Sequence, residues 1–190
     1  YAYTQQDLQL QHINLDSMER AANAMEKSLS ARSADFVSGY SSRKISFKDI
    51  KAVLAPGDAV VEVVRVQGYD SAPAGNVRYI GLVLTGSMAS PRLIVLENGQ
   101  QLETRYAKFY RNAIQQRIAD DHSYAQYWAA IEAALTGKKD IYVSPDGIYN
   151  QINLNTLRKP GGDYLINRYN VITIGNSKDL ITLKNRRAKS

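Results

Sequence analysis

One run of residues, Ala59 to Val66 (AVVEVVRV), restricts the possible folds of this chain more than any other. It is almost continuously apolar and β-branched, which predicts a strand covered on both faces, as in a parallel sheet. Arg78 to Thr85 and Arg92 to Leu96 predict two further strands. Later in the chain, Ile141 to Val143 and Val171 to Ile174 are short apolar runs of the same kind. These runs together predict the strands of one sheet.

Segments with helical apolar spacing separate the strands: Ile50 to Leu54, Leu102 to Ile118, and Tyr124 to Leu135. The first begins with a capping box, Ser46 to Asp49, and we expect Ser123 to cap the third. The second contains Leu102, Tyr106, Phe109, Tyr110, Ala113, Ile114 and Ile118. Strands separated by helices in this way predict an α/β sandwich, with a largely parallel central sheet flanked by helices.

The most distinctive stretch is Ile141 to Leu157, IYVSPDGIYNQINLNTL. Ser144-Pro145 ends its strand, because proline has no N–H to donate to a sheet. Asp146-Gly147 predicts a turn, since Asp hydrogen-bonds nearby backbone and Gly accepts a positive φ without steric cost. The asparagines that follow are typical of helix caps and loops. We therefore expect a core strand, a tight turn and a polar link to a short helix that starts near Asn153.

This stretch and the later YLINRYNVITIGNSKDL closely resemble the CHAT domain, a caspase- and separase-like cysteine peptidase module of bacterial proteins that usually carry TPR repeats upstream. The segments VLAPGDAVVEVVRV and RYIGLVLTG are also similar to that family, so the resemblance spans residues 45–183. The family's catalytic His and Cys lie beyond the last residue of this chain. The resemblance therefore implies a caspase-like N-terminal half without a working active site.

The resemblance also implies an activity for the parent protein: a thiolate, with His as base and acid, attacks a peptide carbonyl of a protein substrate. This chain would support and regulate that catalytic half. Three parts are expected: an N-terminal helix and connector at residues 1–44, the CHAT half at residues 45–183, and a basic tail at residues 184–190 that leads to the catalytic half. The expected partners are that half, upstream TPR repeats and the protein substrate, in the cytoplasm.

A long helix is expected to precede the sandwich. Apolar residues recur on one helical face at Leu15, Met18, Ala22, Met25 and Leu29, after a possible capping box at residues 4–7. Two roles stay open for this helix: packing on its own domain, or connecting the domain to upstream repeats. The chain begins without Met, and we expect it to be a piece of a longer protein.

No residue is assigned a catalytic, cofactor-binding or metal-binding role. Asp120, Asp121 and His122 could be metal ligands, but consecutive side chains diverge, and an interhelix loop of cap formers explains them better. Asp146 before Gly147 fits a turn rather than a catalytic carboxylate. The nucleotide-binding glycine motifs are absent, and Ser41, Ser87 and Ser90 lack the setting of a nucleophile elbow.

Composition excludes several classes of protein. The 190 residues carry no Cys, which excludes a disulfide scaffold and a cysteine nucleophile within this chain. No apolar run approaches the roughly 20 residues of a membrane helix. The net charge is +6, but the only dense basic run is Lys184 to Lys189. Two alternatives remain open: a stand-alone protein-interaction module and a nucleic-acid-binding domain. The nucleic-acid-binding domain is disfavoured because the positive charges are scattered along the chain.

Overall fold

The computed structural model describes residues 15–32, 44–68 and 77–187. The chain divides into two compact units, Tyr1–Lys44 and Ile45–Ser190. In the first unit, helix α2 (Leu15–Arg32) covers most of the segment for which we predicted a helix. Its Met18 and Met25 are 61% and 68% exposed. The possible capping box at residues 4–7 lies outside the described residues.

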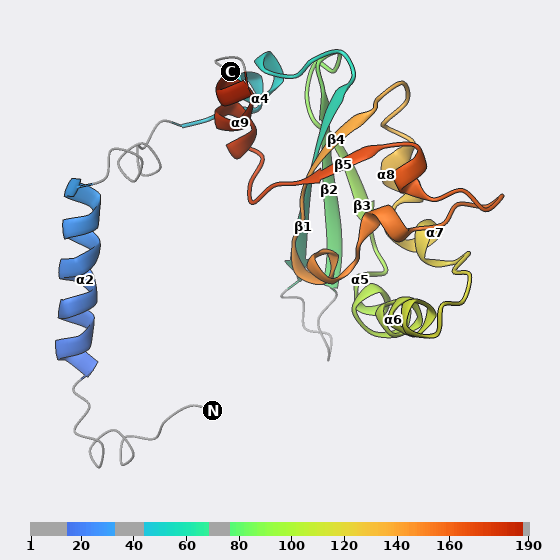
Figure 1. The fold of residues 1–190 in the computed structure, drawn as a ribbon, viewed down its shortest axis with the longest axis horizontal. Helices are drawn as coiled ribbons and strands as arrows, with labels where there is room; N and C mark the ends of the chain where they lie inside the picture. The colour runs from blue at the N-terminus through green and yellow to red at the C-terminus, as the bar shows by residue number, and fades with distance from the viewer. Residues whose placement is uncertain (1–14, 33–43, 69–76, 188–190) are drawn as a thin grey trace, which may run out of the picture. The chain divides into compact units, whose positions relative to one another are not determined.

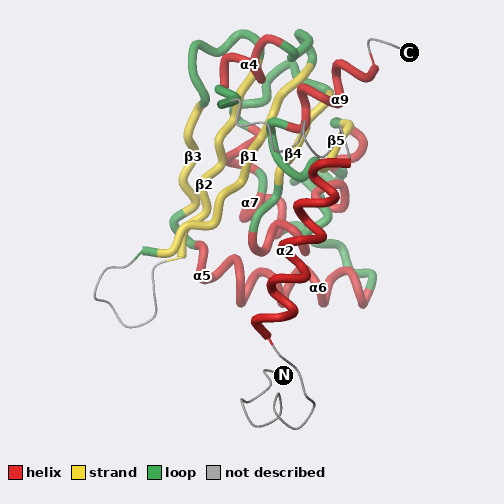
Figure 2. Tube along the Cα trace, turned by 90° about the vertical axis from the view of Figure 1, so that its left-hand side faces the viewer, coloured by secondary structure: helices red, strands yellow, loops and turns green. Residues whose placement is uncertain are grey.

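The second unit is a mixed α/β structure built on one sheet. Within the described residues the sheet has five strands, in the order β3-β2-β1-β4-β5 (Figure 2). The strands are β1 (Asp58–Gln67), β2 (Val77–Thr85), β3 (Arg92–Leu96), β4 (Asp140–Ser144) and β5 (Asn170–Thr173). All five coincide, within one or two residues at each end, with the apolar runs that predicted them.

The prediction of a largely parallel sheet is wrong, because the sheet is mixed. Strand β2 pairs antiparallel with both β1 and β3, whereas β4 pairs parallel with both β1 and β5. Only short connections separate β1, β2 and β3, and such connections favour antiparallel neighbours. The connections before β4 and β5 are longer and contain helical segments, as parallel pairing requires.

Both faces of β1 are covered, as its continuous apolar run predicted. Ala59, Val61 and Val63 belong to a larger core, and α5 (Gly99–Gln101), α6 (Ala107–Gln116), α7 (Ser123–Tyr127) and α8 (Ala129–Glu132) lie on that side of the sheet (Figure 1). Val60 points to the opposite face, where Ile50 and Leu180 complete a smaller core. That face carries α4 (Phe47–Ala52) and α9 (Asp179–Arg187) (Figure 1).

The helical pattern from Leu102 to Ile118 takes two forms. Residues Leu102–Tyr106 form a π-helical turn, and α6 follows until Arg117, whose φ of 55° ends the helix. Leu102 and Tyr110 are buried, but several apolar members of the pattern are exposed: Phe109 (41%), Ile114 (48%) and Ile118 (59%). The apolar residues of this segment are therefore too many for one buried stripe.

The prediction that Ser123 caps the next helix is wrong. Asp120 supplies the cap, because its Oδ1 accepts hydrogen bonds from the backbone N–H groups of His122 (3.0 Å) and Ser123 (2.9 Å). The Ser123 hydroxyl is buried and has no hydrogen-bond partner in the described part of the chain. A carboxylate two or three residues earlier reaches the free N–H groups better than the hydroxyl at the helix start.

Residues 184–187, the first part of the expected basic tail, continue helix α9. Lys184 is mostly buried, and its Nζ lies 2.6 Å from Oδ2 of Asp58, whose side chain is 3% exposed. Burial works against the charged lysine, but Asp58 and Tyr142 together outweigh it and raise the pKa of Lys184. This ion pair fixes α9 to the start of β1.

Candidate functional site

The turn after β4 is the centre of the most distinctive stretch. Asp146 Oδ1 accepts from the N–H of Gly147 (2.7 Å), and Oδ2 accepts from the backbone N–H of Arg65 in β1 (2.8 Å). Gly147 has a φ of +53°. The backbone N–H of Tyr149 donates to the Asp146 carbonyl (3.1 Å), which confirms the predicted turn, and Gly147 also begins a 3-10 helix, Gly147–Gln151. Because both carboxylate oxygens of Asp146 hold backbone N–H groups, this carboxylate acts as a structural clamp between β4 and β1.

A network of three side chains lies against the same turn. The buried hydroxyl of Tyr79 accepts from the N–H of Ile148 (2.8 Å) and donates to Glu103 Oε1 (2.7 Å). Glu103 in turn receives two hydrogen bonds from Arg65, to Oε1 (2.5 Å) and Oε2 (3.1 Å). The network therefore joins β1, β2 and the π-helical turn to the residues that follow Gly147.

The protonation states of this network are well defined. The hydrogen bond from Arg65 lowers the pKa of Glu103, against the opposing effect of burial. Burial raises the pKa of Tyr79 to about 12, and the neighbouring Glu103 adds to that rise. At neutral pH the carboxylate is thus ionised and the phenol is protonated. Such a fixed donor and acceptor arrangement suits support of the turn rather than proton transfer.

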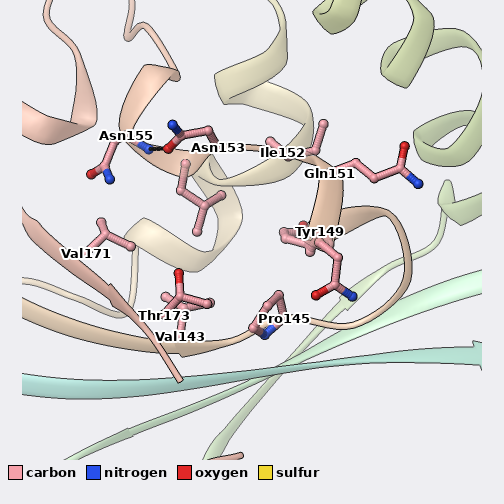
Figure 3. Close-up of a pocket in the computed structure, with 11 residues that line it drawn as sticks. Val143, Pro145, Tyr149, Gln151, Ile152, Asn153, Asn155, Val171 and Thr173 are labelled. Atoms are coloured by element: carbon pink, nitrogen blue, oxygen red, sulfur yellow. Dashed lines mark hydrogen bonds between the residues drawn. The ribbon is translucent and has the colours of Figure 1, made fainter. Parts of the chain in front are cut away.

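A hollow of about 310 Å³ opens beside β4 and β5. Figure 3 shows its two sides: Val143, Pro145, Val171 and Thr173 come from the strands or their ends, and the segment from Tyr149 to Asn155 lies opposite.

The short helix predicted near Asn153 is a single 3-10 turn, Leu154–Thr156, and the Asn153 side chain accepts from the N–H of Asn155 (3.1 Å). The asparagines of the stretch therefore shape the rim of the hollow.

This hollow adjoins an edge of the sheet. Strand β5 is the outermost strand on that side, and no other described strand pairs with its outer edge. Asn170 and Ile174 direct their N–H groups to carbonyls of Lys139 and Val143, at the β4 side. Because N–H groups alternate in direction along a strand, those of Val171 and Thr173 point away from β4. The outer edge of β5 thus presents two hydrogen-bond donors next to a partly apolar hollow.

A second polar cluster surrounds Glu132, whose side chain is 10% exposed. Its carboxylate accepts from Lys159 Nζ (2.8 Å), from the Tyr169 hydroxyl (2.8 Å) and from the Tyr124 hydroxyl. Burial alone would raise the pKa of Glu132, but these three hydrogen bonds outweigh it and lower the pKa. The cluster ties α8 to the segment between Leu157 and β5. Sequence reasoning missed it because its members are up to 45 residues apart along the chain.

The three candidate metal ligands have separate roles. Asp120 caps α7, Asp121 forms an ion pair with Arg158, and the His122 ring packs edge-on against Phe109 with centroids 5.3 Å apart. In the described ranges, no group of three His, Cys, Asp or Glu residues is arranged to hold a metal ion.

Of the serines weighed as nucleophiles, Ser87 and Ser90 lie in the loop between β2 and β3. The Ser87 hydroxyl hydrogen-bonds Thr85 (3.1 Å), and Ser41 lies outside the described residues.

None of the helices described here is long and apolar enough to cross a membrane. Comparisons of the chain with protein-family models, with curated proteins and with solved structures find no match. The fold and the site thus define a mixed α/β unit in which the distinctive stretch turns against β1 and β2 and then lines the hollow beside the open edge of β5.

Proposed function

We propose that residues 45–183 are the non-catalytic N-terminal half of a bacterial, TPR-associated CHAT protein, a caspase-like cysteine endopeptidase. In this proposal the unit carries and regulates a C-terminal half that holds the His/Cys dyad and cleaves protein substrates in the cytoplasm. The observation that carries the proposal is the open edge of β5 beside the hollow. The motif that resembles the family lines that hollow, so its residues lie where a following half could attach.

The chemistry of the motif supports a structural role for this half. Two acidic residues at the turn of the motif, Asp146 and Glu103, accept hydrogen bonds from backbone or cationic partners. No cysteine exists in the chain to act as a nucleophile. A thiolate and its His would therefore have to come from the C-terminal half.

The mixed sheet with helices on both faces is compatible with a caspase-like sandwich. Strand addition at β5 would extend this sheet, since an exposed edge can accept a further strand through backbone hydrogen bonds. The apolar floor of the hollow, which includes Val143 and Val171, would receive side chains of the added segment. In this proposal the N-terminal unit passes a regulatory signal from the upstream TPR repeats to residues 45–183.

Mixing the chain with the separately expressed C-terminal half tests this proposal. Light scattering measures association, and hydrogen exchange measures protection of the Val171 and Thr173 amides. We expect a complex in which both amides become protected. Thr173→Lys should weaken the complex at least about tenfold, because a lysine at the edge opposes strand pairing. The matched control, Val95→Lys on the opposite outer strand β3, should leave it unchanged.

Two results would overturn the proposal. One is the absence of any complex at high micromolar concentration. The other is a complex that forms while the amides of β5 exchange as fast as in the isolated chain.

A further inference from the structure

A second pocket, of about 320 Å³, lies on a different surface of the same unit. Tyr106, Phe109 and His122 form its walls, and Arg105 and Lys108 lie at its rim. These residues come from the π-helical turn, from α6 and from the loop before α7. The pocket shares no lining residue with the hollow beside β5.

The walls of this pocket are apolar although they face solvent. Phe109 remains 41% exposed even though it packs edge-on against His122. The two rings meet edge to face with centroids 5.3 Å apart, and the pocket volume of about 320 Å³ is large enough for one large side chain. Aromatic side chains that insert into such pockets supply much of the affinity of many protein interfaces.

The rim of the pocket is positively charged without compensation. Between Gly99 and Arg117 the chain has one acidic residue, Glu103, which is bound to Arg65 and Tyr79. The same segment has four exposed cations that form no ion pair with any other described residue: Arg105, Lys108, Arg111 and Arg117. Of the two acidic residues before His122, Asp121 is paired with Arg158, and Asp120 is buried with its Oδ1 accepting from the backbone N–H groups of His122 and Ser123. The surface around the pocket therefore attracts negative charge.

The π-helical turn connects this pocket to the network beneath the Asp146-Gly147 turn. The wider turn places Glu103 toward Arg65 and Tyr79, while Arg105 and Tyr106 line the pocket. Such π-helical turns are rare and occur frequently at functional sites. The π-helical turn therefore indicates a functional site independently of the charge and the shape of the pocket.

We propose that this pocket binds an acidic linear segment of another protein. One aromatic side chain of the segment inserts beside Phe109 and His122, and carboxylates next to it pair with Arg105 and Lys108. The apolar anchor provides affinity, and the cations provide orientation and fast association. This site goes beyond the proposed function, because binding here needs neither the edge of β5 nor a C-terminal half.

Selection of peptides from a random phage-displayed library, with the full chain as target, tests the inference. We expect the enriched peptides to carry an aromatic residue flanked by Asp or Glu. Fluorescence anisotropy then measures the affinity of a labelled enriched peptide. Phe109→Ala and Lys108→Glu should each weaken it at least about tenfold, and high salt should weaken it further. The matched controls, Leu93→Ala and Lys48→Glu, change an exposed apolar residue and an exposed cation elsewhere and should have no effect.

Several outcomes would overturn the inference: a selection that enriches no acidic aromatic peptides, or peptides whose affinity is the same for the Phe109→Ala and Lys108→Glu variants as for the unaltered chain. Displacement of the bound peptide by a single-stranded oligonucleotide that itself binds in a Phe109-dependent way would assign the pocket to nucleic acid instead. Circular dichroism of each variant confirms that the fold is retained.

Discussion

Gly147 is a position where any side chain should disturb the turn after β4. Its φ is +53°, and an added Cβ would lie 2.3 Å from the Tyr79 hydroxyl and 3.0 Å from Cδ of Arg65. The hydroxyl therefore has to move in a Gly147→Ala variant. That movement breaks its hydrogen bonds to the buried N–H of Ile148 and to Glu103.

The loss of stability can be estimated from these two effects. A left-handed backbone conformation costs a non-glycine residue roughly 1–2 kcal/mol. A buried N–H left without its acceptor costs about 1–3 kcal/mol more. We therefore expect Gly147→Ala to lower the free energy of unfolding by about 2–5 kcal/mol. Gly137→Ala is a matched control, because Gly137 also has a positive φ (+73°) but nothing lies within 4 Å of its added Cβ.

Urea denaturation followed by circular dichroism measures both variants. Gly137→Ala should show only the backbone cost, so the difference between the variants isolates the collision with Tyr79. A second test is a double-mutant cycle with Tyr79→Phe, which removes the hydroxyl. On that background Gly147→Ala should cost less than in the unaltered chain. The reasoning is refuted if both glycine variants lose the same stability, or if the cycle shows no coupling.

Other predictions concern buried and charged groups. Val143→Asp should cost about 3–5 kcal/mol in the same assay, because Val143 is 1% exposed between β1 and β5; a change within about 0.5 kcal/mol would contradict an interior strand. Lys184→Met should cost about 2–4 kcal/mol, since it leaves the buried Asp58 without its cation; an unchanged denaturation midpoint would show that α9 is held otherwise. Because the pKa of Glu103 is lowered in the folded state, its contribution to the free energy of unfolding is complete above the ordinary carboxyl pKa and is lost as the pH falls through the lower folded value. Glu103→Gln should therefore make stability fall less steeply at acid pH. An unaltered dependence of stability on pH would contradict this role of Glu103. The purified chain should not hydrolyse a panel of peptide substrates, and turnover abolished by His122→Ala would disprove that.

Local sequence patterns were sufficient for the strands and for the turn after β4. The β-branched run at Ala59 predicted a strand with two covered faces, because alternating side chains of one strand must enter two cores. Arg92 to Leu96 predicted β3 with the same bounds. Asp146 and Gly147 predicted their turn because the interactions that define it involve groups within a few residues. The features of the site that depend on neighbours in sequence were therefore predictable.

Features that depend on distant partners emerged only from the tertiary structure. Strand direction is one example, because the apolar run of β1 is compatible with parallel and antiparallel neighbours alike. The carboxylate of Glu132 is another, since its partners Lys159 and Tyr169 lie 27 and 37 residues away. Lys184 pairs with Asp58 across 126 residues. A sequence pattern records what each residue prefers locally, whereas the packing of distant segments decides which groups meet.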